Sequence, residues 1–304
     1  MNVTLRRRKP TSIDAQDRTI KLMMLPLLIT IIFLGTLPLL LSVLAAFTDW
    51  SAGIDVPINF IGLENFRYML TDTQFLASFR LGLVWTLLVT SLTTAMGVGL
   101  SLLLNQDKRY MIPLKVIALS PWAMSPPAIA VIWTTLMNPN SGPVNQFLRA
   151  FNLPGGDIGF LEDPTLFFPT LVVIGAWALM PMITLAVLAA LKTIPKELEE
   201  SMEVDGANGL RKFRYLILPH IKPILIPLVA LNLIWNFGAF DLIYVIVGSF
   251  PPPNSEIPIV FAFRQAFKYG EFGYASALGV TIAIAELLLV IAILRKQFKA
   301  MSQQ

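Results

Sequence analysis

The stretch EESMEVDGANGLRKFRYLILP (Glu199–Pro219) places a dense run of charge between two of the most apolar stretches of the chain. Around it, the 304 residues are 55% hydrophobic and only 14% charged, with a mean hydropathy of +0.68. A typical soluble domain carries about 25% charged residues, so this chain is too apolar to be one. The composition therefore predicts a membrane protein whose charged stretch lies outside the bilayer.

Six apolar runs are long enough to cross a bilayer as helices, because a span needs roughly 20 apolar residues and must satisfy its own backbone groups. The runs are Leu22–Phe47, Leu81–Leu104, Val116–Met137, Thr165–Leu191, Ile224–Val247 and Tyr274–Leu294. Prolines within or beside them, Pro26, Pro38, Pro121, Pro126, Pro127, Pro169, Pro181 and Pro227, predict kinks. We therefore predict an all-α membrane protein that folds as a six-transmembrane-helix bundle over residues 22–294.

Basic residues gather on one side of these predicted spans. The N-terminal segment 1–21, the tail 295–304 and the loops after the second and fourth spans hold 18 of the 23 Lys and Arg residues. The opposite side holds Arg67, Arg80, Arg149, Arg264 and Lys268. Since cytoplasmic loops of membrane proteins carry the excess of Lys and Arg, we expect both termini in the cytoplasm. The same rule accounts for the formal charge of +4 without a nucleic-acid partner.

The charged stretch belongs to the largest internal loop on the cytoplasmic side, residues 193–219. Pro195 suits the first turn of a helix, and Glu197 and Glu199 follow where acidic groups complement the helix dipole. Gly206 and Gly209 weaken continuation of that helix. We therefore expect two short helices joined by a glycine turn, with acidic residues before the turn and basic residues after it. Such a projection can dock into a charged socket on a partner.

The order of residues in this loop is specific. Glu200 is followed by Asp205-Gly206-Ala207, and nine residues separate Gly206 from the tetrapeptide LILP, residues 216–219. This pattern resembles the cytoplasmic signature of permease subunits of binding-protein-dependent ABC importers, which reads E-A-A, three residues, G, nine residues, I-x-L-P. Ser201 and Met202 replace the two alanines and Leu216 replaces the isoleucine, while the spacing is kept.

Further segments extend the resemblance over nearly the whole chain. FIGLENFRYML (60–70) looks like a segment that precedes the second span in this family. NPNSGPVNQFL (138–148), LAALKTIPKELEE (188–200), FDLIYV (240–245) and FGYASALGV (272–280) look like its maltose and glycerol-phosphate type sugar-importer branch. The loop after Val247 reads VGSFPPP where that branch has a T-x-G-G-P turn, so we carry over no receptor contacts there.

The resemblance implies a type I ABC importer permease in a prokaryotic inner membrane. Its implied partners are a second homologous permease subunit, two ATP-binding subunits and an extracytoplasmic solute-binding protein. The resemblance also assigns coupling to the ATPase to the loop, with Glu200, Asp205, Gly206, Ala207 and Arg211 as the residues concerned.

No catalytic or metal-binding residue is expected in this chain. It contains no G-x-x-x-x-G-K-[ST] phosphate loop, so we expect no cofactor here, with ATP and Mg bound by the partner subunits. The absence of cysteine and the single His220 exclude a Cys-based metal site and a histidine cluster.

Polar and aromatic residues in the fifth predicted span indicate a substrate pathway. Asn232, Trp235, Asn236 and Phe240, with Ala239 between them, recur at helical spacings of three and four and predict a stripe on one face. In maltose-type importers, equivalent positions contact sugar, and amides and aromatic rings suit a carbohydrate. Trp177 and Met182 in the fourth span are further candidates. Ordinary helix packing through the asparagines is the alternative.

We accordingly predict half of a pathway for a di- or oligosaccharide, or a polyol phosphate. A rival function rests on Glu286 in the sixth predicted span and Asp241 late in the fifth, because an acid inside a membrane can relay protons. A proton-coupled secondary carrier would use Glu286, but the sequence shows neither inverted repeats nor paired acids. We favour an interhelical hydrogen bond or an inner-cavity position for Glu286.

Overall fold

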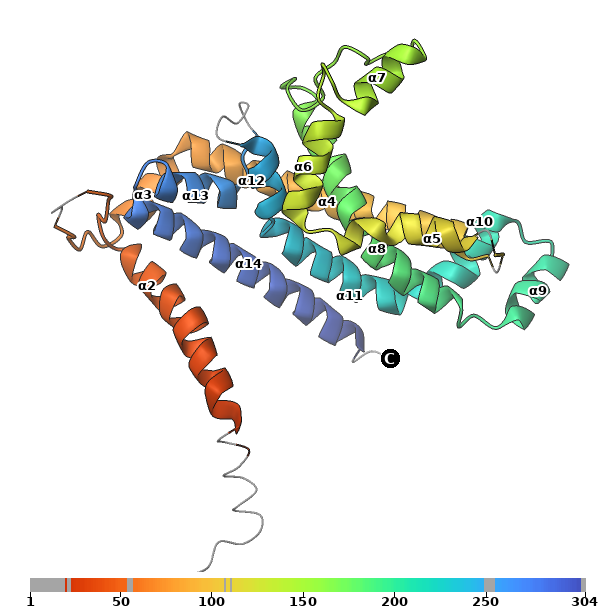
Figure 1. Cartoon of the computed structure of the whole chain (residues 1–304). Coiled ribbons are helices and arrows are strands. Elements are labelled where there is room, and N and C mark those ends of the chain that lie inside the picture. The colour runs from red at the N-terminus through yellow and green to blue at the C-terminus, as the bar shows by residue number, and fades with distance from the viewer. Residues whose placement is uncertain are drawn as a thin grey trace, which may run out of the picture.

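The computed structural model describes residues 20, 23–53, 57–106, 108–109, 111–248 and 255–301, with side chains up to Arg295. Within these ranges the chain is helical, and an isolated β-bridge joins Thr48 and Phe60. Long helices form the body, from which α7 (Pro143–Ala150) and α9 (Lys196–Val204) project in different directions (Figure 1). The predicted N-terminal segment apart from Ile20, the loop 249–254 and the last residues of the tail lie outside the described residues.

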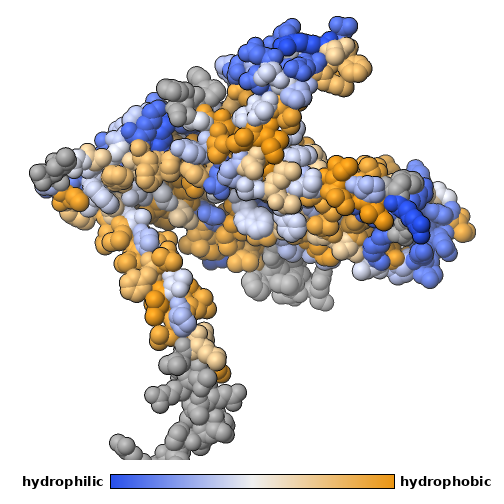
Figure 2. Space-filling model, in the orientation of Figure 1, coloured by the Kyte–Doolittle hydropathy of each residue, from blue (hydrophilic) through white to orange (hydrophobic). Residues whose placement is uncertain are grey.

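Five helical runs of the described chain are long and apolar enough to cross a membrane. They are Met23–Ala45 with η1 (Ile31–Thr36) and α2 (Leu37–Ala45), Thr73–Leu104 (α4), Phe167–Leu191 (α8), Gly209–Phe237, and Phe272–Arg295 within α14 (Phe272–Met301). A bent pair of shorter helices meets the same criteria of length and apolarity when its two parts are taken together as one span. Apolar surface follows the long helices, and hydrophilic residues gather over α7 and around α9 (Figure 2). The predicted all-α bundle of membrane helices is confirmed.

The third predicted span is not one helix. It consists of α5 (Met111–Leu119) with η2 (Ser120–Ala123), and of α6 (Pro126–Leu136), and the two parts meet at an angle of 110°. Ser125 between them is extended, with φ −71° and ψ 147°, as expected for a residue that precedes proline. Pro126 and Pro127 also remove two backbone donors, so the helix cannot continue across this point.

The fifth predicted span also differs from its expected bounds. Its helix begins at Gly209 and runs through α10 (Gly209–Lys212), η3 (Phe213–Ile217) and α11 (Leu218–Phe237), so the second of the two expected short helices is instead continuous with the span. The same span ends at Phe237, and α12 (Asp241–Val247) continues separately after a break at Gly238–Phe240. The second span is longer than predicted as well, because Asp72 caps α4 at Thr73 by accepting hydrogen bonds from the amides of Gln74 and Phe75.

The core lies where α4, α8 and α11 pack together. α8 is the most buried span, and two glycines allow α4 to approach it closely. A Cβ on Gly97 would lie 2.6 Å from the Cβ of Ile183, and a Cβ on Gly175 would lie 2.8 Å from the ring of Trp85. Trp85, only 1% exposed, donates its indole N–H to the carbonyl of Asn236 on α11 at 3.1 Å.

Two of the resembling segments fasten the end of α2 to the body. Asn65 of the segment 60–70, at the start of α3 (Glu64–Thr71), donates hydrogen bonds to the carbonyls of Ala46 and Thr48 at 3.0 and 2.9 Å. Gly273 of the segment 272–280 donates its amide to Trp50 at 2.8 Å. A Cβ at Gly273 would lie 2.1 Å from the Thr48 carbonyl oxygen, so the backbone approach requires glycine.

Candidate functional site

A cavity of about 480 Å³ lies where the two broken spans meet. One wall comes from the α5–α6 break, with Trp122 and Met124, and another from the α11–α12 break, with residues 235, 236 and 238–242. α4 and α8 complete it with Trp85, Gly175, Ala178 and Leu179. Irregular backbone inside a membrane is tolerated where it lines a cavity, so both breaks fit a solute pathway.

The structure brings four of the predicted pathway residues to this cavity. Trp235, Asn236, Ala239 and Phe240 all line it, although they do not form one helical stripe. The predicted stripe is wrong beyond Phe237, because the helix ends there and Ala239 and Phe240 belong to the break. Trp235 is 48% exposed and is one of the aromatic residues that line the cavity.

The two asparagines are buried in helix packing. Asn236, 1% exposed, donates its side-chain N–H to the hydroxyl of Thr90 at 3.2 Å and to the carbonyl of Asn232 at 2.9 Å. Asn232 is fully buried, donates to the carbonyl of Leu228 at 3.1 Å and does not line the cavity. The packing alternative therefore describes Asn232, whereas Asn236 serves both the core and the cavity wall.

The candidates of the fourth span lie away from this cavity. Trp177 packs edge-on against Trp133 of α6, with ring centroids 5.4 Å apart, and Met182 is half-buried on α8. Sequence reasoning missed Trp122, which is 58% exposed and lines the cavity beside Pro121. The sequence feature that could have revealed Trp122 is the Pro121-Trp122 pair a few residues before the double proline, since this spacing places an aromatic side chain at a helix break.

Two acids flank the α11–α12 break. Asp241 lines the cavity and is exposed. Glu286 of α14 is half-buried, and its carboxylate oxygens lie 3.7 and 3.9 Å from the position that a Cβ on Gly238 would take. The interhelical hydrogen bond expected for Glu286 is not found among the described residues, so Glu286 only lies close to the break.

The second candidate site is the charged projection, residues 193–219. Glu197 and Glu199 occupy the first turn of α9, as predicted, whereas Pro195, expected within that turn, precedes the helix as its extended N-cap residue. Gly206 has φ +70° and makes the turn, a conformation that side chains disfavour. After it, Asn208 caps the next helix by accepting the amide of Arg211 at 2.9 Å.

An ion pair holds the two arms of this projection together. Lys212 Nζ contacts Glu203 Oε1 at 2.5 Å, which joins the acidic arm to the basic one. Glu200, Asp205, Gly206 and Arg211 are exposed, and Ala207 is half-buried. Sequence reasoning missed the exposed apolar residues here, since Val204, Leu210 and Tyr215 are 88%, 75% and 69% exposed. Exposed apolar groups beside free charges are typical of a protein interface.

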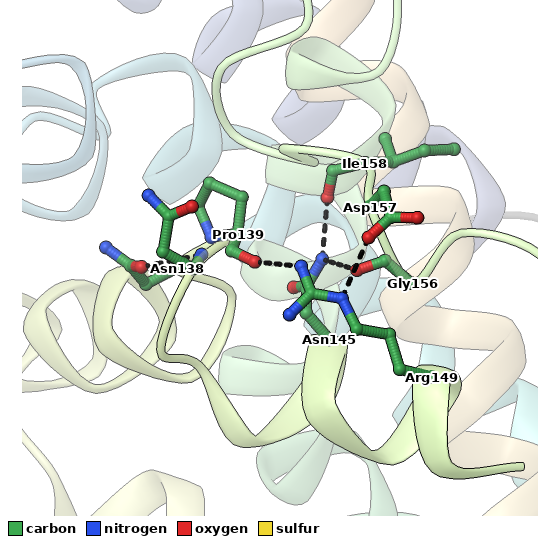
Figure 3. Close-up of polar contacts among 8 residues, drawn as sticks. Asn138, Pro139, Asn145, Arg149, Gly156, Asp157 and Ile158 are labelled. Atoms are coloured by element: carbon green, nitrogen blue, oxygen red, sulfur yellow. Dashed lines mark hydrogen bonds and ion pairs between the residues drawn. The ribbon is translucent and has the colours of Figure 1, made fainter.

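A third feature is the α7 projection, residues 138–163, which Figure 3 shows in close-up. Asn145, fully buried, donates its side-chain N–H to the carbonyls of Gly156 and Ile158 at 3.0 and 2.8 Å. Arg149 pairs with Asp157 at 2.8 Å and donates to the carbonyl of Pro139 at 2.6 Å. These bonds give the loop a fixed shape.

The α7 projection exposes an aromatic pair. Phe147 and Phe151 are 57% and 64% exposed, with ring centroids 4.6 Å apart. The pair forms an exposed apolar surface at the end of the molecule that carries α6 and α7 (Figure 1).

Comparison with known proteins agrees with this geometry. Residues 96–301 match the family described as binding-protein-dependent transport system inner membrane component. The trehalose/maltose transport system permease protein MalF of Thermococcus litoralis is 29% identical over 279 residues, which cover 90% of this chain and 92% of that protein. The sulfoquinovosyl glycerol transport system permease protein SmoG of Agrobacterium fabrum is 27% identical over 289 residues, covering 93% and 92%.

A solved structure shares the fold. A chain in the crystal structure of a bacterial alginate ABC transporter, in complex with an alginate pentasaccharide-bound periplasmic protein, superimposes with a TM-score of 0.79 at 22% identity. The alignment covers 92% of this chain and 93% of that one. The family match includes the charged projection and most of the cavity wall, and the chain therefore belongs to the binding-protein-dependent inner membrane components, the permease subunits of ABC transporters.

Proposed function

We propose that the chain forms half of the translocation pathway of an ATP-driven importer for a saccharide. The observation that carries this proposal is the cavity at the two helix breaks, lined by the aromatic side chains of Trp122, Trp235 and Phe240. Aromatic faces stack on sugar rings, and backbone groups freed by a helix break can bond hydroxyls. The names of MalF and SmoG, which both refer to sugar-containing solutes, support the same class of cargo.

The pathway is completed by partners. A second homologous permease supplies the other half, and an extracytoplasmic solute-binding protein delivers the saccharide. The alginate transporter structure, which holds a periplasmic protein, supports such a receptor. The α7 projection offers it an exposed surface, with Phe147 and Phe151 as the apolar contact.

Energy arrives through the charged projection. Two partner ATP-binding subunits hold ATP and Mg, and Glu200, Asp205, Gly206, Ala207 and Arg211 form the contact that couples their motion to the bundle. A carboxylate such as Glu200 gains most at a partly desolvated interface by accepting a charge-assisted bond from a basic partner residue. The exposed apolar side chains of Val204 and Leu210 support burial of this surface in a complex.

This arrangement requires both termini in the cytoplasm of a prokaryotic cell, with the chain in the inner membrane. The excess of Lys and Arg on the side of the charged projection supports that orientation. A reporter fused after Gln304 that requires the cytoplasm should be active, and one that requires the periplasm should be inactive. The reverse pattern would contradict the orientation.

The test of function uses vesicles that contain the complete complex and its receptor. Uptake of maltose, trehalose, cellobiose and glycerol 3-phosphate is measured with and without ATP, for the wild type and for Trp235→Ala. We expect ATP-dependent uptake of at least one saccharide, lowered by Trp235→Ala but not by Phe33→Ala, since Phe33 is 61% exposed on the first span and does not line the cavity. Uptake driven by a pH gradient without ATP would instead support the carrier that uses Glu286. The permeases compared above provide no support for that alternative.

A further inference from the structure

The cavity has a single charged group in its lining. Among the described residues that surround it, Asp241 is the one ionisable side chain, and none is Lys, Arg or His. The remaining polar groups are the indoles of the tryptophans, the amide of Asn236 and backbone atoms of the helix break. The charge of this half of the pathway is therefore negative.

The carboxylate of Asp241 is also available to accept hydrogen bonds from a solute in the cavity. This carboxylate has no hydrogen-bond or ion-pair partner among the described residues, and the side chain is exposed. The Asn236 amide, in contrast, already donates to Thr90 and Asn232. An ionised carboxylate can accept bonds from two neighbouring hydroxyls of one sugar, since it offers two oxygens and about four lone-pair sites.

A second acid reinforces the negative potential. Glu286 approaches the helix break from α14, with a carboxylate oxygen 3.7 Å from the position that a Cβ on Gly238 would take. Like Asp241, Glu286 has no basic partner among the described residues. Like charges repel strongly where water is partly excluded, because the effective dielectric constant is lower than in bulk solvent.

We infer that Asp241 acts as a charge filter, so that the cavity accepts uncharged polyhydroxylated solutes through hydroxyl-to-carboxylate bonds and aromatic stacking and rejects solutes bearing a phosphate, carboxylate or sulfonate. This inference rests on the proposed function and narrows its cargo to neutral saccharides. Asp241 is assigned as a selectivity residue that contacts the solute. Trp122 and Trp235, which both line the cavity, supply the stacking surfaces.

The test measures the local charge directly and needs no knowledge of the cargo. The chain contains no cysteine, so Ala239→Cys places a single thiol on the cavity wall two residues before Asp241. In the reconstituted complex, mass spectrometry of this chain follows the reaction rates with a cationic and an anionic methanethiosulfonate of similar size. Each rate is divided by the rate of the same reagent with a free thiol in solution, which gives a normalised cation-to-anion ratio.

We expect that ratio to exceed one by roughly tenfold, because the carboxylate attracts one reagent and repels the other. Asp241→Asn should reduce it severalfold, Asp241→Glu should preserve it, and Glu271→Gln, an exposed acid outside the cavity, should leave it unchanged. If the thiol reacts with both reagents and Asp241→Asn leaves the ratio unchanged, the charge filter is wrong while the pathway stands. If the thiol reacts with neither reagent in any nucleotide state, the cavity is not part of a solute pathway, and the proposed function fails first.

Discussion

Gly206 offers a substitution whose effect can be worked out from the geometry of its turn. The residue has φ +70°, and a Cβ added to it would meet no atom within 4 Å. Gly206→Ala therefore introduces no clash, and its whole effect comes from placing an L-residue in the left-handed region, which costs about 1 kcal/mol. Gly206→Val adds β-branching, and we expect about 2 kcal/mol. If the ATPase binds the turn as it stands, these values correspond to losses of affinity of about fivefold and thirtyfold.

Gly209 provides the matched control. A Cβ on Gly209 would also meet no atom within 4 Å, but Gly209 does not have a positive φ and begins a helix. Gly209→Ala should therefore leave binding unchanged, and Gly206→Asn should largely restore it because asparagine tolerates the left-handed region. The assay titrates the ATP-binding subunit against the purified permease pair and measures receptor-stimulated ATP hydrolysis. Equal affinities for Gly206→Ala and Gly209→Ala would refute the reasoning. Normal receptor-stimulated ATP hydrolysis with Gly206→Val would show that the charged projection only connects two spans and does not couple the ATPase to the bundle.

Three further outcomes are expected. Gly97→Ala should lower the free energy of unfolding of the purified chain by about 1–3 kcal/mol, because the added methyl group overpacks against α8. Gly99→Ala places its methyl group in open space on the same helix and should be neutral or stabilising, so equal effects of the two substitutions would contradict the packing. Asn236→Leu should lower the free energy of unfolding by about 1–3 kcal/mol, because it leaves the Thr90 hydroxyl without its hydrogen-bond donor, and should lower uptake without abolishing assembly. Unchanged stability and uptake would count against the roles of Asn236 in the core and in the cavity wall. Burial raises the pKa of Glu256, and the nearby charge of Arg264 opposes this shift. The folded state therefore binds the proton more tightly than the unfolded state, so Glu256 stabilises the fold at a pH below its ordinary pKa and this stabilisation is lost as the pH rises through the raised pKa. The free energy of unfolding of the wild type should increase relative to that of Glu256→Gln as the pH falls from 7 to 5, and a pH-independent difference would argue against the raised pKa.

Much of this molecule could be predicted because the bilayer allows few structures. A run of apolar residues in lipid must become a helix, so the spans could be located from composition alone. Local chemistry also predicted the charged projection, since Pro195, the acidic first turn of α9 and the glycine at residue 206 each act over a few residues. Coupling by its exposed residues, in contrast, stays a prediction that the resemblance implies.

The two helix breaks were not predicted as a pair, and they create the cavity. The double proline at 126 and 127 indicated a kink but not a bend of 110°, whereas Gly238 gave no distinct signal of a break. A glycine inside an apolar run can continue a helix or end it, and neighbouring helices decide which, here including α14 with Glu286 beside Gly238.

The sequence by itself determined the class of protein, the positions of most membrane helices and the shape of the charged turn, because hydrophobicity, proline and positive φ act locally. Only the tertiary structure decided which residues face the cavity. Helical spacing grouped Asn232 with Phe240, but the break at Gly238 ends that periodicity. Asn232 is therefore buried, while Phe240 lines the same cavity as Trp122, which lies more than a hundred residues away in the sequence. Side chains from distant segments meet through packing, and no local pattern in the chain encodes the angle at which two helices pack.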